Sequence, residues 1–315
     1  MLRFTFLSLL LLLALPVGVS VAQSPKAPAK KPATSAPKRE PLRSTPPDTI
    51  QAELDITYGK TPEQELKLDI YRPKVGGDKM PACVLVHGGG WMKGDKEKFR
   101  PLAISLAEKG YVVANIEYRL GDVAKYPAAV QDCNLAVRFV RANASRFGID
   151  PNRIGAWGGS AGGHLVGLMA AAPAHEKYLT GTGDLRDVSA AVQASCIMAG
   201  PTDLTMETFV EALRRAKEKS NSFQWLGRLY DDAPDLYREA SPITHFSKST
   251  GPVLFLTGDL DNPERDAPGM AKLKELGVPT NQVIVKDAKH GCWMQKPWHE
   301  QCVDAVDAWF KEHLK

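Results

Sequence analysis

Segments of two kinds alternate along most of the chain, and their hydrophobic patterns predict the fold class. The strand-like apolar segments are residues 82–86, 111–116, 153–157, 191–198, 253–257 and 283–285. The segments with a helical pattern are residues 99–109, 128–147, 162–172 and 298–314. Continuous apolar strands are typical of a sheet that is buried on both faces. The alternation therefore predicts an α/β domain with a mostly parallel sheet and helices on both faces.

Two segments depart from this alternation. Leu66, Leu68 and Ile70 alternate with polar residues, which is typical of an antiparallel edge strand. Residues 201–241 contain one helical pattern, over 206–219, and several aromatic residues. About forty structureless residues are unusual inside a compact domain, so we expect a small cap over the carboxyl ends of the strands rather than a long surface connection.

The first 22 residues have the pattern of a cleaved secretory signal. They contain one charge, Arg3, then an apolar run over residues 9–15 and small residues near the expected cleavage site. A permanent membrane anchor is the alternative, but it needs about 20 apolar residues, and Pro16 interrupts the run. We therefore expect a secreted or periplasmic protein without a stable membrane anchor.

Composition and charge separate a linker from a folded domain. Residues 23–48 are rich in Pro, Lys and Ala, which predicts a flexible linker before one large domain over residues 49–315. Residues 1–48 hold seven of the 40 basic residues and two of the 36 acidic residues, so the predicted domain is nearly neutral. Nucleic acid is not an expected partner, because the excess basic charge does not lie on a folded face.

Two glycine-rich clusters each follow a strand-like segment. The cluster GGSAG at 158–162 matches G-x-S-x-G, the sharp turn from strand to helix that exposes a serine hydroxyl. The cluster HGGGW at 87–91 lies upstream. Glycines allow a close backbone approach where side chains would clash. The first cluster therefore predicts a nucleophile, Ser160, and the second predicts a loop of N–H donors for a developing oxyanion.

A serine nucleophile needs an imidazole base. In G-x-S-x-G hydrolases the acid and then the base follow the serine along the chain. His290 lies in a loop just after the last strand-like segment, so we predict that it is the base. His299 and His313 are expected to be partly exposed surface residues of the last helix. His87 and His164 are expected to have structural roles.

The acid that orients the base must come from the loop after residues 253–257. Asp259 and Asp261 both lie there. Asp261 is three residues beyond Gly258 and can swing towards His290, so it is the favoured acid. Asp259 is expected to cap the turn instead.

Other residues of the predicted site are donors and aromatic contacts. We expect the oxyanion donors to be the N–H groups of Gly89, Gly90 and Ala161, with Trp91 as a further candidate. Trp91, Phe209 and Trp225 are predicted to contact substrate through their flat faces.

The cysteines do not predict a metal site. Cys292 and Cys302 flank a short segment near His290, and a disulfide between them is left open. No Cys/His cluster has zinc spacing, and neither a metal nor an organic cofactor is expected.

From about residue 54 onward the sequence resembles the α/β-hydrolase superfamily. HGGGW, GGSAGGH, the PTD segment at 201–203 and the G-x-x-D that ends at Asp261 are similar to its esterase branch. That branch includes feruloyl and acetylxylan esterase-like domains and hormone-sensitive-lipase-like esterases. Thr257 stands where many relatives have His, which leaves the acid in place.

The resemblance implies a mostly parallel eight-stranded sheet with helices on both faces and a small cap insertion. It also implies a serine esterase that acts on short-acyl or aryl esters, carbohydrate-linked ones included, through an acyl-enzyme on Ser160. Its partner would be a small-molecule or polysaccharide ester. The oligomeric state is not predicted.

Three alternative functions stay open. An arylformamidase also has an HGGxW loop, and a peptidase of the prolyl-oligopeptidase type shares the triad. A binding module without activity is the third, and it would be expected to have a broken triad.

The signal prediction is tested by the mature N-terminus. When the full chain is exported by a bacterial host, mass spectrometry should place that N-terminus within a few residues of Gln23. Intact Met1 in the membrane fraction would instead support an anchor.

Overall fold

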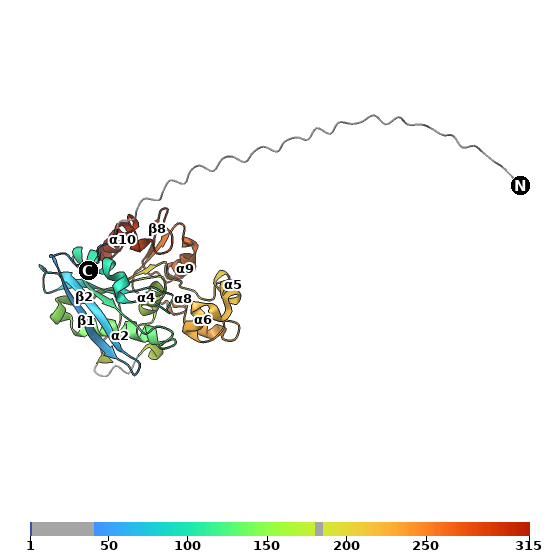
Figure 1. Ribbon diagram of the computed structural model, residues 1–315, viewed down its shortest axis with the longest axis horizontal. Coiled ribbons are helices and arrows are strands. Elements are labelled where there is room, and N and C mark those ends of the chain that lie inside the picture. Colours follow the sequence, from blue (N-terminus) through green and yellow to red (C-terminus); the bar gives the residue numbers. More distant parts are fainter. Residues whose placement is uncertain (2–40, 180–184) are drawn as a thin grey trace, which may run out of the picture. The chain divides into compact units, whose positions relative to one another are not determined.

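The computed structural model describes residue 1 and residues 41–179 and 185–315. The predicted signal and most of the predicted linker lie outside these residues. The described part contains an eight-stranded sheet in the order β1-β2-β4-β3-β5-β6-β7-β8 (Figure 1). β2 is antiparallel to β1 and β4, and the pairs from β4–β3 to β7–β8 are parallel. The mostly parallel sheet predicted from the sequence is confirmed.

The strands have the following bounds: β1 Ile50–Lys60, β2 Glu65–Pro73, β3 Met80–Val86, β4 Val112–Ile116, β5 Ile149–Gly159, β6 Ala194–Met198, β7 Val253–Gly258 and β8 Thr280–Val285. The α-helices are α1 Arg100–Glu108, α2 Ala128–Ala142, α3 Ala144–Phe147, α4 Ala161–Ala171, α5 Glu207–Ala216, α6 Asn221–Leu226, α7 Pro234–Glu239, α8 Pro242–His245, α9 Ala267–Glu275 and α10 Trp298–His313. Short 3-10 helices are η1 Lys96–Phe99, η2 Glu176–Tyr178, η4 Lys217–Lys219, η5 Pro263–Asp266 and η6 Cys292–Met294.

Two hydrophobic cores lie on the two faces of the sheet. In β3, Ala82, Val84 and Val86 pack into one core, and Cys83 and Leu85 pack into the other. The first core includes side chains of α2, α4 and α9, and the second includes side chains of α1 and α10. Successive side chains of a strand point to opposite faces, so an uninterrupted apolar strand is the expected result of covering both faces.

The edge of the sheet differs from the prediction. Leu66, Leu68 and Ile70 lie in β2, which is the second strand and not the edge strand. The edge strand is β1, which the sequence analysis did not identify. Its residues alternate between apolar and polar over Ile50–Tyr58, so the pattern was present in the sequence, and its pairing with β2 shifts register between Glu53 and Ile56.

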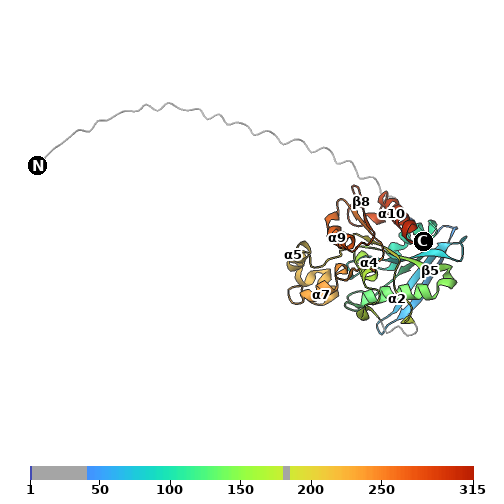
Figure 2. The same cartoon turned by 180° about the vertical axis from the view of Figure 1, so that it is seen from behind.

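Two helical predictions are refined by the structure. The helix expected over 128–147 is divided into α2 and α3, because Asn143 leaves helical geometry and its side-chain amide donates to the Phe139 carbonyl (2.8 Å). Residues 201–241, the predicted cap, contain α5, α6 and α7. Figures 1 and 2 show these helices together at one side of the domain, away from β1 and β2.

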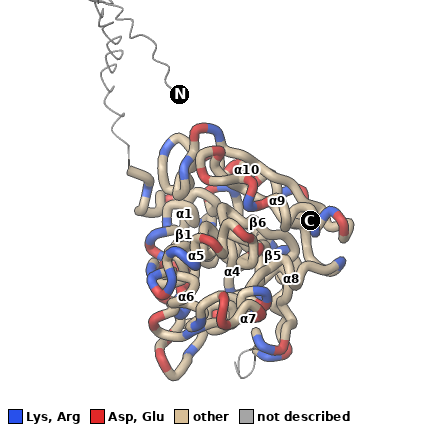
Figure 3. Tube along the Cα trace, turned by 90° about the vertical axis from the view of Figure 1, so that its right-hand side faces the viewer, with Lys and Arg blue, Asp and Glu red and all other residues tan. Residues whose placement is uncertain are grey.

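Charged residues of both signs are interspersed along the described chain, as the view in Figure 3 shows. Within residues 41–179 and 185–315, no helix has both the length and the apolar character needed to cross a membrane.

Candidate active site

Ser160 lies at a sharp turn between β5 and α4. Its backbone is strained, with φ of 57° and ψ of −122°. The glycines on either side permit this turn, because a Cβ on Gly158 would lie 2.3 Å from the Gly162 carbonyl oxygen. A Cβ on Gly162 would lie 2.1 Å from the Val86 carbonyl oxygen. The turn therefore holds the serine hydroxyl beside the end of β3.

Three predicted site residues form one hydrogen-bonded chain. The Ser160 hydroxyl donates to Nε2 of His290 (2.9 Å), and Nδ1 of His290 donates to Oδ2 of Asp261 (2.6 Å). A carboxylate only accepts, so the imidazole proton lies on Nδ1 and leaves Nε2 free to take the serine proton. The residues follow β5, β7 and β8, whose carboxyl ends meet at one edge of the parallel sheet.

Asp261 is also held by a cation, Arg265. The guanidinium of Arg265 donates to Asp261 Oδ1 (2.7 Å) and to the Ala199 carbonyl (3.2 Å). Both carboxylate oxygens of Asp261 therefore have partners. The Asp261 side chain is 10 % exposed, whereas the His290 side chain is 47 % exposed. The sequence analysis did not identify Arg265. Its position four residues after Asp261 was the feature in the sequence that could have indicated this pair.

Asp259 has a structural role, but it bonds to the loop of His290 and not to its own turn as predicted. Its Oδ1 accepts the Ala288 N–H (3.1 Å), and the neighbouring Leu260 N–H donates to the Ala288 carbonyl (3.1 Å). These bonds tie the loop of Asp261 to the loop of His290. Asp259 therefore helps to hold the two loops together, while Asp261 makes the contact with the imidazole.

The HGGGW loop forms a tight turn beside Ser160. Gly89, Gly90 and Trp91 all have positive φ, and the Gly89 carbonyl accepts the N–H groups of Met92 (3.3 Å) and Lys93 (3.2 Å). A Cβ on Gly89 would lie 1.7 Å from the Lys93 carbonyl oxygen, so the turn requires glycine there.

Of the three predicted oxyanion donors, two line the cavity next to Ser160. They are Gly90 and Ala161, whereas Gly89 does not line it. Ala161 is the first residue of α4, so its N–H has no partner within the helix. Gly89 contributes through the turn that orients Gly90.

The cavity has a volume of about 340 Å³. It lies between the nucleophile, the HGGGW loop and the cap. Its lining residues are Gly90, Trp91, Ser160, Ala161, Ala199, Pro201, Asp203, Met206, Thr208, Phe209, Ala212, Asn262 and Arg265. Trp91 and Phe209 are therefore placed where substrate contact was predicted.

Trp225 does not occupy the predicted position. It is fully buried, does not line the cavity and stacks on Trp91, with ring centroids 5.0 Å apart and planes at 13°. The prediction that Trp225 contacts substrate is wrong, because its apolar ring packs into the core beneath Trp91. The sequence of a cap segment does not show whether an aromatic residue contacts substrate or packs into the core.

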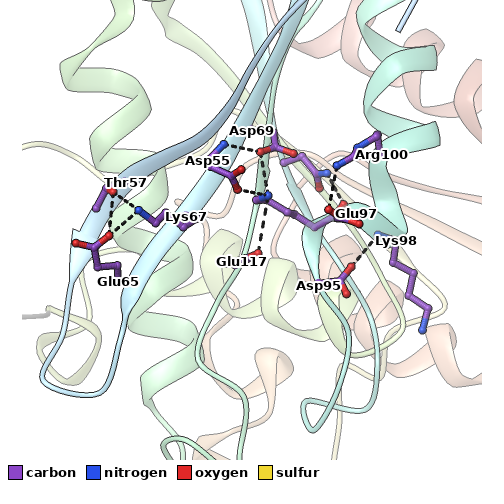
Figure 4. Close-up of polar contacts among 12 residues, drawn as sticks. Asp55, Thr57, Glu65, Lys67, Asp69, Asp95, Glu97, Lys98, Arg100 and Glu117 are labelled. Atoms are coloured by element: carbon purple, nitrogen blue, oxygen red, sulfur yellow. Dashed lines mark hydrogen bonds and ion pairs between the residues drawn. The ribbon is translucent and has the colours of Figure 1, made fainter. Parts of the chain in front are cut away.

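An ion cluster around the buried Lys96 ammonium anchors the segment that follows the HGGGW loop. The carboxylates of Asp55, Asp69 and Glu117 surround the Lys96 ammonium at 2.7, 3.0 and 3.9 Å (Figure 4). Burial disfavours the charged ammonium, but hydrogen bonds to Asp55 and Asp69 outweigh it and raise the pKa of Lys96. The Lys96 carbonyl also accepts from the Asn115 side chain (2.6 Å). Strands β1, β2 and β4 thus hold the segment that follows the loop.

The other histidines are mostly structural. His87 is buried, stacks on Tyr118 at 4.3 Å and has its Nδ1 2.9 Å from the Gly88 carbonyl. Burial lowers the pKa of His87 to about 4. The expectation of an exposed His299 is wrong, because it is 4 % exposed and contacts the Trp293 carbonyl and the Ser105 hydroxyl, each at 2.8 Å.

Cys292 and Cys302 are buried free thiols, so the bridge that the sequence left open is absent between them here. A hydrogen bond between the two thiols lowers the pKa of Cys292. Within the described residues, no group of three or more His, Cys, Asp or Glu side chains could hold a metal ion.

Comparison with known proteins identifies the family. The family model BD-FAE matches residues 68–264, which include the HGGGW loop, Ser160 and Asp261. The chain belongs to the BD-FAE family. Its eight-stranded sheet has the α/β-hydrolase fold, in agreement with the structural neighbours of this BD-FAE chain.

Curated relatives of this BD-FAE chain include esterases. LipQ, an esterase of Mycobacterium tuberculosis, is 34% identical over 233 residues, which are 72% of this chain and 53% of LipQ. The versiconal hemiacetal acetate esterase of Dothistroma septosporum is 30% identical over 251 residues, 76% of this chain and 74% of that enzyme. The chain spans about half the length of LipQ and of its mycobacterial relative LipC.

Two solved structures resemble the BD-FAE chain. Esterase Est2 of Thermogutta terrifontis, with propionate bound, is 27% identical with a TM-score of 0.68, over 84% of this chain and 94% of that one. A truncated carbohydrate esterase from gut microbiota has a TM-score of 0.73, over 85% of this chain and 99% of that one. The latter is 23% identical, so it supports the fold alone.

Substitution of the two aspartates in the loop after β7 should affect kcat very differently. Asp261→Asn should lower kcat on 4-nitrophenyl acetate by up to about four orders of magnitude, because the amide favours the wrong imidazole tautomer. Asp259→Asn is the matched control and should cost far less, because its amide oxygen can still accept the Ala288 N–H. The reverse ranking in steady-state kinetics would assign the acid to Asp259.

Proposed function

We propose that this chain is a serine hydrolase of carboxylic esters with short acyl or aryl groups, carbohydrate-linked esters included. The observation that carries the proposal is the chain of hydrogen bonds from Ser160 through His290 to Asp261, next to the cavity. Family membership supports it, as do the relatives named as esterases.

In the proposed mechanism, Ser160 Oγ attacks the acyl carbon while its proton moves to Nε2 of His290. Asp261 stabilises the imidazolium through the Nδ1–H bond. The N–H groups of Gly90 and Ala161 bind the oxyanion of the tetrahedral intermediate. The proton on Nε2 then passes to the alcohol oxygen, and the alcohol leaves.

Water completes the reaction in a second half that mirrors the first. His290 takes a proton from water, and the resulting hydroxide attacks the acyl-enzyme on Ser160. Collapse of the second tetrahedral intermediate breaks the bond to Oγ, and the serine regains its proton from Nε2. The carboxylic acid is released. Apart from water, each step uses groups that line the cavity or belong to the hydrogen-bonded chain of Ser160, His290 and Asp261.

The composition of the cavity supports a short acyl group. Its apolar wall comes from Trp91 and from Met206, Phe209 and Ala212 of the cap. On α5, Arg214 and Arg215 are exposed, and the buried apolar residues are Val210 and Leu213. Est2 of Thermogutta terrifontis was solved with propionate and with butyrate bound, which agrees with acids of this size.

We also propose that the protein is exported and that residues 1–22 are removed, on the evidence of their composition. Measurement of the mature N-terminus tests this part of the proposal independently of activity.

Loss of the serine hydroxyl tests the proposed mechanism. Ser160→Ala should abolish ester hydrolysis and labelling by a fluorophosphonate probe, because the nucleophile is gone while the fold keeps its contacts. Ser249→Ala is the matched control, since this exposed serine bonds only to Ser247. Equal labelling of the Ser160→Ala variant and the native protein would refute the assignment.

Acyl-chain length tests the substrate class. Each methylene buried in an acyl pocket adds up to about 0.8 kcal/mol of binding, so an enzyme with a long pocket gains steeply with chain length. We expect kcat/KM on 4-nitrophenyl esters to be highest between acetate and butyrate and lower at octanoate. A maximum at octanoate or beyond would contradict the short-acyl proposal. Methyl ferulate, acetylated xylan and N-formylkynurenine in the same panel separate the ester classes from formamidase activity.

A further inference from the structure

His164 is a buried residue that the proposed mechanism does not use. It is fully buried, and both ring nitrogens have protein partners. The indole Nε1 of Trp91 donates to Nδ1 of His164 (3.2 Å). Nε2 of His164 lies 2.7 Å from the Ala240 carbonyl, and it must be the donor because Nδ1 already accepts. These two bonds specify one neutral tautomer.

The two bonds join three separate segments of the site. His164 lies one turn after the nucleophile in α4, and its N–H donates to the Ser160 carbonyl (3.0 Å). Trp91 directly follows Gly90, which lines the cavity. Ala240 lies at the end of the cap segment, after α7. The imidazole of His164 therefore connects the nucleophile helix, the HGGGW loop and the cap.

The backbone at Trp91 needs such support. Its φ is 62°, a conformation that costs a bulky residue energy and persists only where the surroundings hold it. The indole is held by stacking on Trp225, by an edge contact with His164 at 5.2 Å and by its bond to Nδ1. A shift of the indole would change the orientation of the peptide between Gly90 and Trp91.

We propose that His164 is a positioning residue of the hydrolase, which fixes the Trp91 indole and thereby the backbone of Gly90 and Trp91 beside the acyl oxygen; this backbone carries the Gly90 donor and the further candidate, the Trp91 N–H. This inference rests on the proposed function. It assigns His164 to the oxyanion side of the reaction, and His164 transfers no proton. Burial supports the role, because it lowers the pKa of His164 to about 4 and so keeps Nδ1 an acceptor at neutral pH.

Two amide variants separate the two bonds of His164. In His164→Asn, the amide oxygen can take the place of Nδ1 and accept the Trp91 N–H, but the side chain is too short to reach the Ala240 carbonyl. In His164→Gln, the amide nitrogen can take the place of Nε2 and donate to Ala240, but no acceptor remains for Trp91. Both variants remove one buried hydrogen bond, so a merely structural role predicts similar losses of stability and of activity.

The proposal predicts different kinetics for the two variants. On 4-nitrophenyl acetate, His164→Gln should lower kcat by about 10- to 100-fold with KM within about twofold, because misplaced donors weaken only transition-state binding. The rate of fluorophosphonate labelling should fall in parallel. His164→Asn should keep kcat within about threefold of the native value. Equal kcat values for the two variants would overturn the proposal.

Trp91→Phe removes the indole N–H and keeps an aromatic ring, so it tests the same bond if His164→Gln does not fold. It should reproduce the loss in kcat, and the double variant Trp91→Phe/His164→Gln should lose no more than the larger single loss. An unchanged kcat in Trp91→Phe, or fully additive losses, would refute the role of this bond. Native protein that hydrolyses acetate esters through Ser160 while these variants stay fully active would reject this inference and leave the proposed function intact.

Discussion

The site depends on a contact between two stretches of backbone. The turn after β3 and the turn after β5 approach so closely that a Cβ on Gly88 would lie 2.6 Å from the Gly159 carbonyl oxygen, and one on Gly162 would overlap the Val86 carbonyl. Side chains larger than hydrogen are excluded from both surfaces. The close approach places Ser160 and the HGGGW loop beside one cavity, which Gly90, Trp91 and Ser160 all line. Every other element of the site orients groups around this contact.

The sequence predicted this contact well because its requirements are local. Glycines at 88–90, 158, 159 and 162 are needed for backbone reasons, and they leave a pattern that can be recognised without knowledge of the tertiary structure. The order of nucleophile, acid and base follows from the parallel strands, whose carboxyl ends share an edge. The choice of Asp261 over Asp259 used only the distance of each residue from the end of a strand, and the hydrogen bonds agree with that choice.

Roles set by tertiary packing were harder to predict. Trp225 and Phe209 are both aromatic residues of the cap segment, but one supports Trp91 from the core and the other lines the cavity. His299 has the exposed neighbour Glu300 and lies near the start of an amphipathic helix, but α1 covers it and supplies the Ser105 hydroxyl. In each case the deciding partner is far away in the sequence.

The cap packs directly against the HGGGW loop. Trp225 of α6 stacks on Trp91. Asn221, at the start of α6, packs against Gly90 so closely that a Cβ on Gly90 would lie 2.0 Å from the Asn221 side-chain nitrogen. At the end of the cap segment, the Ala240 carbonyl accepts a hydrogen bond from His164 of α4. Substitutions in the cap are therefore expected to act on two quantities at once, the shape of the cavity wall and the orientation of the HGGGW backbone. Because interior packing is close to crystal density, a displaced Trp225 moves Trp91 with it. Specificity and catalytic rate are expected to change together when this cap varies.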